Sequence, residues 1–305
     1  MKKFIIILTA FVAVAFCSAS CDDWTDKEKV DQQVTPPEQQ DPAAWARYVT
    51  ELREYKKSEH AVMFAFFENA PKVAVSERNF LRCLPDSLDA VSLTNADNLS
   101  KYDLEDMPGL REKGTKILYH VDYAERKAEW SDAAALGAYL DQVVGRIAEY
   151  DLDGASFSGV PRIDGSHAEF AAMLVGKLAA AGKMIVFVGD PTFVAAADRS
   201  KVTYYMLDTD ACKTVTDVKL NVSQALDVAQ IPAAKLLLGA SAGKTILDEG
   251  QKAQDAILES ARRVLSEGPL AGMGVMQANN DYYHPALSYM TTRTAIQMLN
   301  PSPVK

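Results

Sequence analysis

The sequence predicts an α/β protein whose main domain is a closed (β/α)8 TIM barrel. From about residue 42 onward, eight short apolar runs alternate with helical stretches. Continuous apolar strands separated by helices are typical of a parallel sheet that is covered on both faces. Since a barrel needs about 250 residues, a chain of 305 residues leaves no second domain of comparable size.

The elements are expected in a regular order. A helix is expected over Pro42–Lys57, where apolar side chains recur at spacings of three and four residues. The predicted strands are Ala61–Phe67, Leu88–Leu93, Lys116–Val121, Leu152–Ser158, Met184–Val188, Val202–Leu207, Lys235–Gly239 and Gly272–Gln277. The predicted helices between them are Tyr102–Glu112, Asp132–Ala148, His167–Ala181, Val215–Ala229 and Asp248–Ser266.

Local signals set several boundaries. Ser166 and Glu169 have the spacing of a capping box at the start of a helix. Gly114 and Gly182 are expected to end helices in the left-handed conformation. The connection Pro191–Ser200 is short for a full helix, which makes the fifth unit the weakest. An open doubly wound sheet is the alternative fold, but no glycine-rich phosphate turn follows the first strand.

The first twenty residues read as an export signal. Lys2 and Lys3 precede the apolar run Phe4–Phe16, which is too short for a membrane-spanning helix of roughly 20 residues. Ser18 to Cys21 resembles a bacterial lipobox, although Ser18 stands where leucine is usual. We therefore expect residues 1–20 to be removed and Cys21 to be lipidated. The alternative is an ordinary signal peptide that is cut nearby.

Residues 21–41 are expected to form a short, flexible, disordered tether before the barrel of residues 42–305. This segment is acidic and glutamine-rich and contains Pro36 and Pro37, a composition typical of linkers. Asp22 and Asp23 resemble the acidic export signal of surface lipoproteins in glycan-foraging Gram-negative bacteria. This predicts a protein anchored to the outer membrane by lipid alone and facing outside. A solvated tail is the simpler alternative.

Composition excludes some classes of protein. With 48% hydrophobic residues, the chain as a whole is not disordered. With 41 acidic against 32 basic side chains, it does not suit nucleic acid. Cys83 and Cys212 could pair or remain separate buried thiols. Because the sequence has no CxxC motif and no histidine-rich cluster, we expect neither a metal nor another cofactor.

The fourth strand carries the most informative motif. Asp153 and Gly154 resemble the opening of the signature D-G-x-D-x-D-x-E of glycoside hydrolase family 18. Other strands resemble the same family, at Gly114-Thr115-Lys116-Ile117-Leu118, Leu237-Leu238-Gly239 and Gly272-Met273-Gly274-Val275-Met276. The resemblance covers roughly residues 60–299. It looks closest to the lipoprotein branch that includes endo-β-N-acetylglucosaminidases acting on N-glycan cores.

The remaining motif positions depart from the family. The two later aspartates are replaced by Ser156 and Ser158, and the glutamate is replaced by Val160. In the family, the glutamate protonates the glycosidic oxygen and the preceding aspartate orients the substrate's acetamido group. Family 18 is a substrate-assisted exception to the two-carboxylate scheme, so the one protein acid is indispensable. The resemblance therefore implies a degenerate motif and no catalytic residues.

Carboxylates at other strand ends could rescue hydrolysis. Those near the predicted ends are Glu68, Asp122, Asp164, Asp190 and Asp208. Asp164 is equally explained as a turn residue before a helix, and Asp153 as a buried structural group.

Active sites of barrels lie at the carboxyl ends of the strands, where this chain has side chains suited to sugars. Asn279, Asn280 and Tyr282 follow the last strand, but that run could also be a polar turn before the Pro285 helix start. His120 and Asp122 could be a structural pair, and Asp208 a solvated loop residue. The predicted ligand-binding residues are Phe67, Glu68, Asn69, Asn95, His120, Asp122, Tyr123, Asp208, Gln277, Asn279, Asn280 and Tyr282.

The sequence thus predicts a surface lipoprotein that binds GlcNAc-containing glycans, including N-glycans, on an inactive family 18-like barrel. Its expected partners are an oligosaccharide or glycoprotein glycan, an outer-membrane glycan importer and neighbouring glycosidases. The alternative is an active hydrolase of the endo-β-N-acetylglucosaminidase or chitinase type with relocated acids. A scaffold without a ligand is a third possibility, favoured if Asn279, Asn280 and Tyr282 pack against protein and leave no groove.

Overall fold

The computed structural model describes residues 35–73 and 76–302. The expected signal peptide, Cys21 and most of the expected tether lie outside these residues. The end of the tether, Pro37–Gln40, forms one helical turn, α2. The chain divides at Arg47 into a short N-terminal unit and a unit that carries the barrel. Across the described ranges, the structure contains no helix with the length and apolar character needed to cross a membrane.

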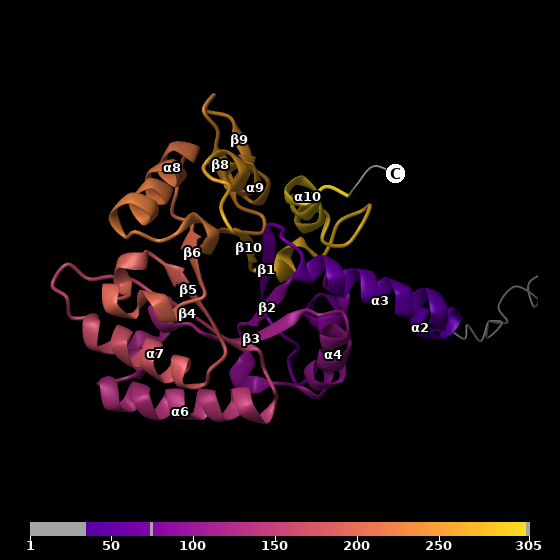
Figure 1. Cartoon of the computed structure of the whole chain (residues 1–305), viewed down its shortest axis with the longest axis horizontal. Helices are drawn as coiled ribbons and strands as arrows, with labels where there is room; N and C mark the ends of the chain where they lie inside the picture. The colour runs from indigo at the N-terminus through magenta and orange to yellow at the C-terminus, as the bar shows by residue number, and fades with distance from the viewer. Residues whose placement is uncertain (1–34, 74–75, 303–305) are drawn as a thin grey trace, which may run out of the picture. The chain divides into compact units, whose positions relative to one another are not determined.

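Eight parallel strands close into a barrel, which confirms the predicted (β/α)8 fold (Figure 1). Their order around the barrel is β1-β10-β7-β6-β5-β4-β3-β2. Every strand begins and ends within two residues of its predicted bounds. The strands are β1 Val62–Phe67, β2 Ala90–Leu93, β3 Lys116–Val121, β4 Gly154–Gly159, β5 Met184–Gly189, β6 Tyr204–Asp208, β7 Leu236–Ser241 and β10 Gly272–Met276.

Helices cover the outside of the barrel, and α6 lies along α7 (Figure 1). The longer helices are α3 Pro42–Lys57, α4 Lys101–Glu112, α6 Ala133–Glu149, α7 Ala168–Ala180, α8 Val215–Ser223, α9 Ala256–Ser266 and α10 Met290–Leu299. A single turn, α5 Tyr123–Arg126, follows β3, and a π-helical turn over Gln224–Val228 continues α8. The fifth connection forms only the 3-10 turns Pro191–Phe193 and Ala196–Lys201, as its length suggested.

The predicted helix Asp248–Ser266 is wrong before Ala256, where α9 begins. An antiparallel hairpin of β8 Thr245–Leu247 and β9 Ala253–Asp255 precedes α9. The carboxylate of Asp248 closes the turn, because it accepts hydrogen bonds from the backbone nitrogens of Gly250 at 2.8 Å and Lys252 at 2.9 Å. Asp255 then caps α9, whose first amides need an acceptor.

The capping box predicted at Ser166 is also wrong. The Ser166 hydroxyl donates to Asp164 Oδ1 at 2.8 Å, and α7 begins at Ala168 after a His167 cap without a side-chain hydrogen bond. The short turn at Asp164 captures the serine before the helix can use it. Gly114 and Gly182 do adopt the predicted left-handed conformation, with φ of 77° and 65°.

The core has two layers, because side chains alternate across each strand. Phe64, Phe66 and Met206 fill the barrel interior, whereas Phe67 and Tyr205 belong to the layer between the barrel and the helices. Cys83 and Cys212 are separate, half-buried thiols.

Candidate functional site

A polar hollow of about 600 Å3 lies where β1, β2, β3 and β10 end at the carboxyl rim of the barrel. This volume is within the usual range for small-molecule sites. The hollow combines amides, carboxylates and an imidazole with one aromatic wall. Its lining residues are Phe66, Glu68, Thr94, Asn95, His120, Asp122, Met276, Gln277, Asn279 and Asn280.

The structure brings seven of the predicted ligand-binding residues together in this polar hollow: Glu68, Asn95, His120, Asp122, Gln277, Asn279 and Asn280. They come from four different connections, because parallel strands present all their carboxyl ends at one rim. Asn279 and Tyr282 pack against protein, as the scaffold alternative expects, but a hollow remains open beside Asn280, which that alternative does not expect.

The other predicted residues lie elsewhere. Phe67 is fully buried in the outer layer, and its neighbour Phe66 lines the hollow instead. Asn69 is buried and donates to Asp103 Oδ2 at 2.9 Å. Tyr123 packs against Trp130, with 5.9 Å between the ring centroids.

Two more predicted residues also point to different surroundings. The Tyr282 hydroxyl donates to Glu77 Oε2 at 2.8 Å, outside the polar hollow. Asp208 lines a second hollow of about 330 Å3 beside Val160, together with Asp190, Asn221 and Gln224; we call this the acidic hollow. Burial raises the pKa of the Asp208 carboxyl.

The first two of the motif's four acidic positions, Asp153 just before β4 and Ser156 within it, help to build the barrel. The Asp153 carboxylate accepts from the Ile117 backbone nitrogen at 2.9 Å and so joins β4 to β3. Ser156 is fully buried, and its hydroxyl lies 2.8 Å from His120 Nδ1 and 3.0 Å from the Ser92 hydroxyl. These contacts satisfy a serine but supply no acid.

The third acidic position of the motif, Ser158, has a carboxylate beside it. The Ser158 hydroxyl donates to Asp122 Oδ1 at 2.6 Å and accepts from the Ala124 backbone nitrogen at 2.9 Å. Asp122 therefore stands at the end of β3, next to the position where the family has an aspartate. Val160, at the glutamate position, is 58% exposed and offers neither a proton nor an acceptor.

His120 forms the floor of the polar hollow. Burial lowers its pKa to about 4, against the opposing effect of the Asp122 carboxylate. The ring meets Phe66 edge-on, with 5.2 Å between centroids. At neutral pH, His120 is therefore an uncharged hydrogen-bonding group.

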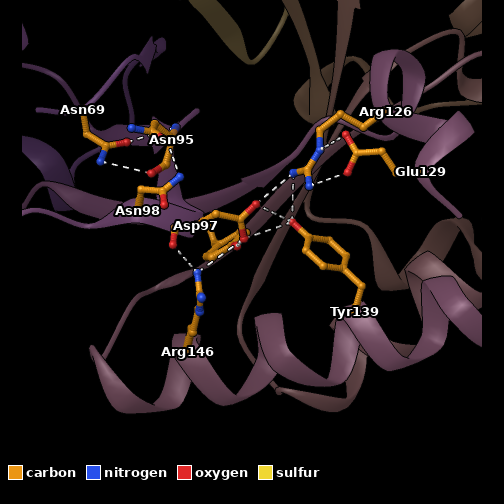
Figure 2. Close-up of polar contacts among 9 residues, drawn as sticks. Asn69, Asn95, Asp97, Asn98, Arg126, Glu129, Tyr139 and Arg146 are labelled. Atoms are coloured by element: carbon orange, nitrogen blue, oxygen red, sulfur yellow. Dashed lines mark hydrogen bonds and ion pairs between the residues drawn. The ribbon is translucent and has the colours of Figure 1, made fainter. Parts of the chain in front are cut away.

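An ionic cluster holds the loop that brings Asn95 to the hollow (Figure 2). Asp97, in the 3-10 turn Ala96–Asn98, accepts from Arg126 Nη1 at 3.0 Å. Arg146 Nη1 donates to the Asp97 carbonyl at 2.6 Å, and the Tyr119 hydroxyl donates to the Asp97 carboxylate. The Asn95 backbone nitrogen donates to Asn69 Oδ1 at 3.0 Å. Asn69 and Asp97 thus fix the position of Asn95, and the sequence alone gave no signal for Asp97.

Asn279 fixes the loop after β10 in the same way. Its amide accepts from the Glu68 backbone nitrogen at 2.8 Å and donates to the Arg78 carbonyl at 2.9 Å. Asn280 is exposed and donates to Gln277 Oε1 at 3.2 Å. Asn279 therefore joins two loops through hydrogen bonds, while Gln277 and Asn280 remain accessible to a ligand.

In the described ranges, no cluster of three or more histidine, cysteine, aspartate or glutamate side chains is arranged to hold a metal ion. The polar groups of the hollow are instead hydrogen-bonding groups on several loops. Such an arrangement can orient a polyhydroxylated ligand.

Residues 25–135 match the family described as "Glycoside hydrolase family 18, BT1044-like". No curated protein sequence matches the chain. A selenomethionine form of BT1044 has 22% identity over 88% of this chain and 96% of its own, with a TM-score of 0.68.

Two further structures share the fold. An endo-β-N-acetylglucosaminidase from Cordyceps militaris has 17% identity over 83% of this chain and 95% of its own, with a TM-score of 0.66. YKL-39, solved in the presence of chitooligosaccharides, has 9% identity over 79% of this chain and all of its own, with a TM-score of 0.62. The chain therefore has the barrel of the family 18 proteins, and its match over residues 25–135 confirms the resemblance to glycoside hydrolase family 18.

Proposed function

We propose that this protein is a glycan-binding protein built on a catalytically inactive family 18-like barrel. The proposal rests on one observation: Ser156, Ser158 and Val160 stand where the family motif has acidic residues. Hydrolysis by the family's mechanism needs an acid within hydrogen-bond reach of the glycosidic oxygen. A valine cannot donate a proton, so we expect the barrel to bind a glycan and release it unchanged.

The polar hollow supports binding of sugars. Asn95, Gln277 and Asn280 offer planar amides for hydroxyl groups, and Glu68 and Asp122 offer acceptors. Phe66 lines the hollow but is only 1% exposed, so hydrogen bonds and not ring stacking would hold a sugar there. Two of the similar structures carry names that point to the same ligand class, an endo-β-N-acetylglucosaminidase and YKL-39 with chitooligosaccharides. We therefore propose GlcNAc-containing glycans, including N-glycans.

Calorimetry and mass spectrometry together test this function. The whole protein is titrated with high-mannose N-glycans, complex N-glycans and chitooligosaccharides, and the same mixtures are then searched for products. We expect saturable binding of at least one of these glycans without cleavage. Release of free glycan by catalytic amounts of protein would overturn the proposal, and so would the absence of binding to every glycan.

Substitutions locate the binding site. Glu68→Gln and Asn280→Ala change accessible side chains of the polar hollow, so each is expected to weaken binding roughly tenfold, the loss of about one good hydrogen bond. Glu51→Gln removes a carboxylate from the exposed face of α3 and is the matched control. Equal affinities for all three variants and the unchanged protein would place the site elsewhere.

Hydrolysis with relocated acids is the second candidate function. Two observations favour it: Asp122 lies 2.6 Å from the Ser158 hydroxyl, and burial raises the pKa of Asp208 in the acidic hollow beside Val160. An acid with a raised pKa is what a glycosidase needs as proton donor. If cleavage is found, Asp122→Asn and Asp208→Asn test which carboxylates are responsible. If both residues are catalytic, each of the two substitutions should abolish cleavage.

We further propose that Cys21 carries a lipid that anchors the protein to the outer membrane, facing outward. There it would pass glycans to neighbouring glycosidases and an importer. The proposal rests on the lipobox-like Ser18 to Cys21 and on the acidic residues after it. Cys21→Ala is expected to release the protein from membranes, and protease added to intact cells should digest the unchanged protein. Membrane retention of Cys21→Ala would contradict the anchor.

A further inference from the structure

A third hollow, of about 340 Å3, lies at the same rim between the loops that follow β3 and β4. We call it the basic hollow. It is lined by Tyr123, Ala124, Lys127, Val160, Arg162, Ser166, His167 and Phe170. Lys127 and Arg162 bring two positive charges, and no carboxylate is part of the lining. By contrast, the polar hollow contains Glu68 and Asp122, and the acidic hollow contains Asp190 and Asp208.

The walls of the basic hollow are fixed by aromatic packing. The Tyr123 ring is buried and lies 5.8 Å from the Phe170 ring, centroid to centroid. The His167 ring stacks on Phe193 at a centroid distance of 5.3 Å. The hollow therefore keeps its shape without a ligand, which lowers the entropic cost of binding.

The polar groups of the basic hollow are donors. His167 Nδ1 accepts from the Arg162 backbone nitrogen at 3.0 Å, so the neutral ring carries its proton on Nε2. Arg162 Nε lies 3.5 Å from Asp164 Oδ1, but both side chains are more than half exposed, and such a pair is weak. The guanidinium and the Lys127 ammonium thus remain available to an acceptor.

The basic hollow adjoins the polar hollow at the end of β3. Asp122 lines the polar hollow, and the next two residues, Tyr123 and Ala124, line the basic one. Ser158 ties them together, because its hydroxyl donates to Asp122 and accepts from the Ala124 nitrogen. One extended ligand can therefore contact both hollows.

We infer that the basic hollow binds an anionic substituent, a sugar carboxylate or a sulfate ester, on the glycan that the polar hollow holds. This inference rests on the proposed function and adds the charge of the ligand to it. Arginine pairs with a carboxylate or sulfate through two parallel hydrogen bonds, and lysine adds a second positive charge. Tyr123 and Phe170 offer apolar surface to the ring that bears the anion.

Matched glycans test the inference with the whole protein. Calorimetry compares a complex N-glycan that ends in sialic acid, the same glycan after the sialic acid is removed, and a sulfated counterpart. We expect at least one acidic form to bind roughly tenfold more tightly than the neutral form, as a charge-assisted contact allows. High salt should reduce this preference, because the hollow is open to solvent. The two acidic forms separate a carboxylate ligand from a sulfate ligand.

Arg162→Gln and Lys127→Gln should each reduce the preference for the acidic glycan while the neutral glycan binds as before. Both side chains are exposed, so folding, checked by thermal melting, should be unchanged. Lys219→Gln on α8 removes the same charge away from the hollow and should keep the preference. Equal binding of neutral and acidic glycans to the unchanged protein would overturn this inference alone. Binding of neither form while a high-mannose N-glycan or a chitooligosaccharide still binds would also overturn this inference, and the absence of binding to every glycan would overturn the proposed function as well.

Discussion

Ser158 illustrates how far single residues could be predicted. Its place in the motif and its lack of a carboxyl group follow from the sequence, but its bond to Asp122 requires two strands to meet. Asn279 shows the opposite limit. It was predicted to bind a ligand, yet its amide joins Glu68 and Arg78, which are more than 200 positions away in the chain. The prediction placed Phe67 at the ligand, but Phe66 lines the hollow. Side chains alternate between the two faces of a strand, and the sequence does not say which of two neighbouring phenylalanines faces the barrel interior.

Gly154, the second motif residue, is expected to be structurally indispensable. Its φ of 154° is rarely adopted by other residues, and a Cβ there would overlap the backbone of Met184. Gly154→Ala should lower the free energy of unfolding by about 2–3 kcal/mol or more. Gly145→Ala in α6 meets no atom within 4 Å and should be neutral or stabilising by up to about 1 kcal/mol. Urea denaturation of both variants measures these changes in stability. Equal effects of the two substitutions would contradict the structural role of Gly154.

His120 should make stability depend on pH. Its folded pKa of about 4 lies below the ordinary value of 6.5, so the unfolded chain binds the proton more readily. The stabilisation is complete above pH 6.5 and is lost as the pH falls from 6.5 towards 4, by an amount on the order of 2–3 kcal/mol. His60 acts in the opposite direction, because its hydrogen bond to Asp89 raises its pKa.

The difference between the unchanged protein and His120→Gln isolates this effect. His60 titrates in both proteins, so its contribution cancels in the difference. Urea denaturation across this pH range should give a smaller loss of stability for His120→Gln. Parallel curves for the two proteins would show that His120 is not held neutral.

At the scale of elements, strands were predicted better than connections. Each strand is a continuous apolar run, and its burial on both sides makes that run necessary. The hairpin β8–β9 was missed because its strands are only three residues long and depend on the Asp248 turn. Likewise, the sequence gave no signal for the contacts that anchor the loop after β2, since Asp97 meets Arg126 and Arg146 from two later elements.

Asp97 is expected to stabilise that loop. Asp97→Ala removes the acceptor shared by Arg126, Arg146 and Tyr119, and the carboxylate is only about a third exposed, at 32%. We expect a loss of about 1–2 kcal/mol in the free energy of unfolding, after allowing for solvent screening. Hydrogen exchange should also speed up at Asn95, which follows β2.

An exposed ion pair provides the control. Asp141 lies 2.6 Å from Lys177 on the protein surface, with 62% of its side chain exposed. Asp141→Asn should change stability by no more than about 0.5 kcal/mol and leave exchange at Asn95 unaltered. If Asp97→Ala behaves like Asp141→Asn, the cluster does not hold the loop.

At the scale of the whole molecule, the barrel follows from the number and order of apolar runs, and the position of the site follows from the barrel. The division of the rim into three hollows of different charge does not follow. It depends on how the loops pack after folding. Val160, just after β4, borders both the acidic and the basic hollow. The position of the missing acid therefore lies between the acidic and the basic hollow.

Val160→Glu tests whether that missing acid is the principal defect. The side chain is 58% exposed and borders two hollows, so a glutamate fits without displacing core atoms. Asp122, held by Ser158, is available as the second carboxylate near an acetamido group. A correctly placed general acid contributes roughly a hundredfold or more to the rate. Val160→Glu should therefore release glycan at least about a hundredfold faster than Val160→Gln, which has the same shape but no acidic proton.

The matched pair Val160→Glu and Val160→Gln separates chemistry from binding. Both variants should bind glycan alike, because neither changes Glu68, Asn280 or the polar hollow. Adding Ser158→Asp to Val160→Glu should hinder activity unless Asp122→Asn is also present, since a carboxylate would then replace the Ser158 hydroxyl that now donates to Asp122. If Val160→Glu binds glycan and remains inactive, the barrel has lost more than its acid, and the geometry around Ser156 and Ser158 is the next cause to examine.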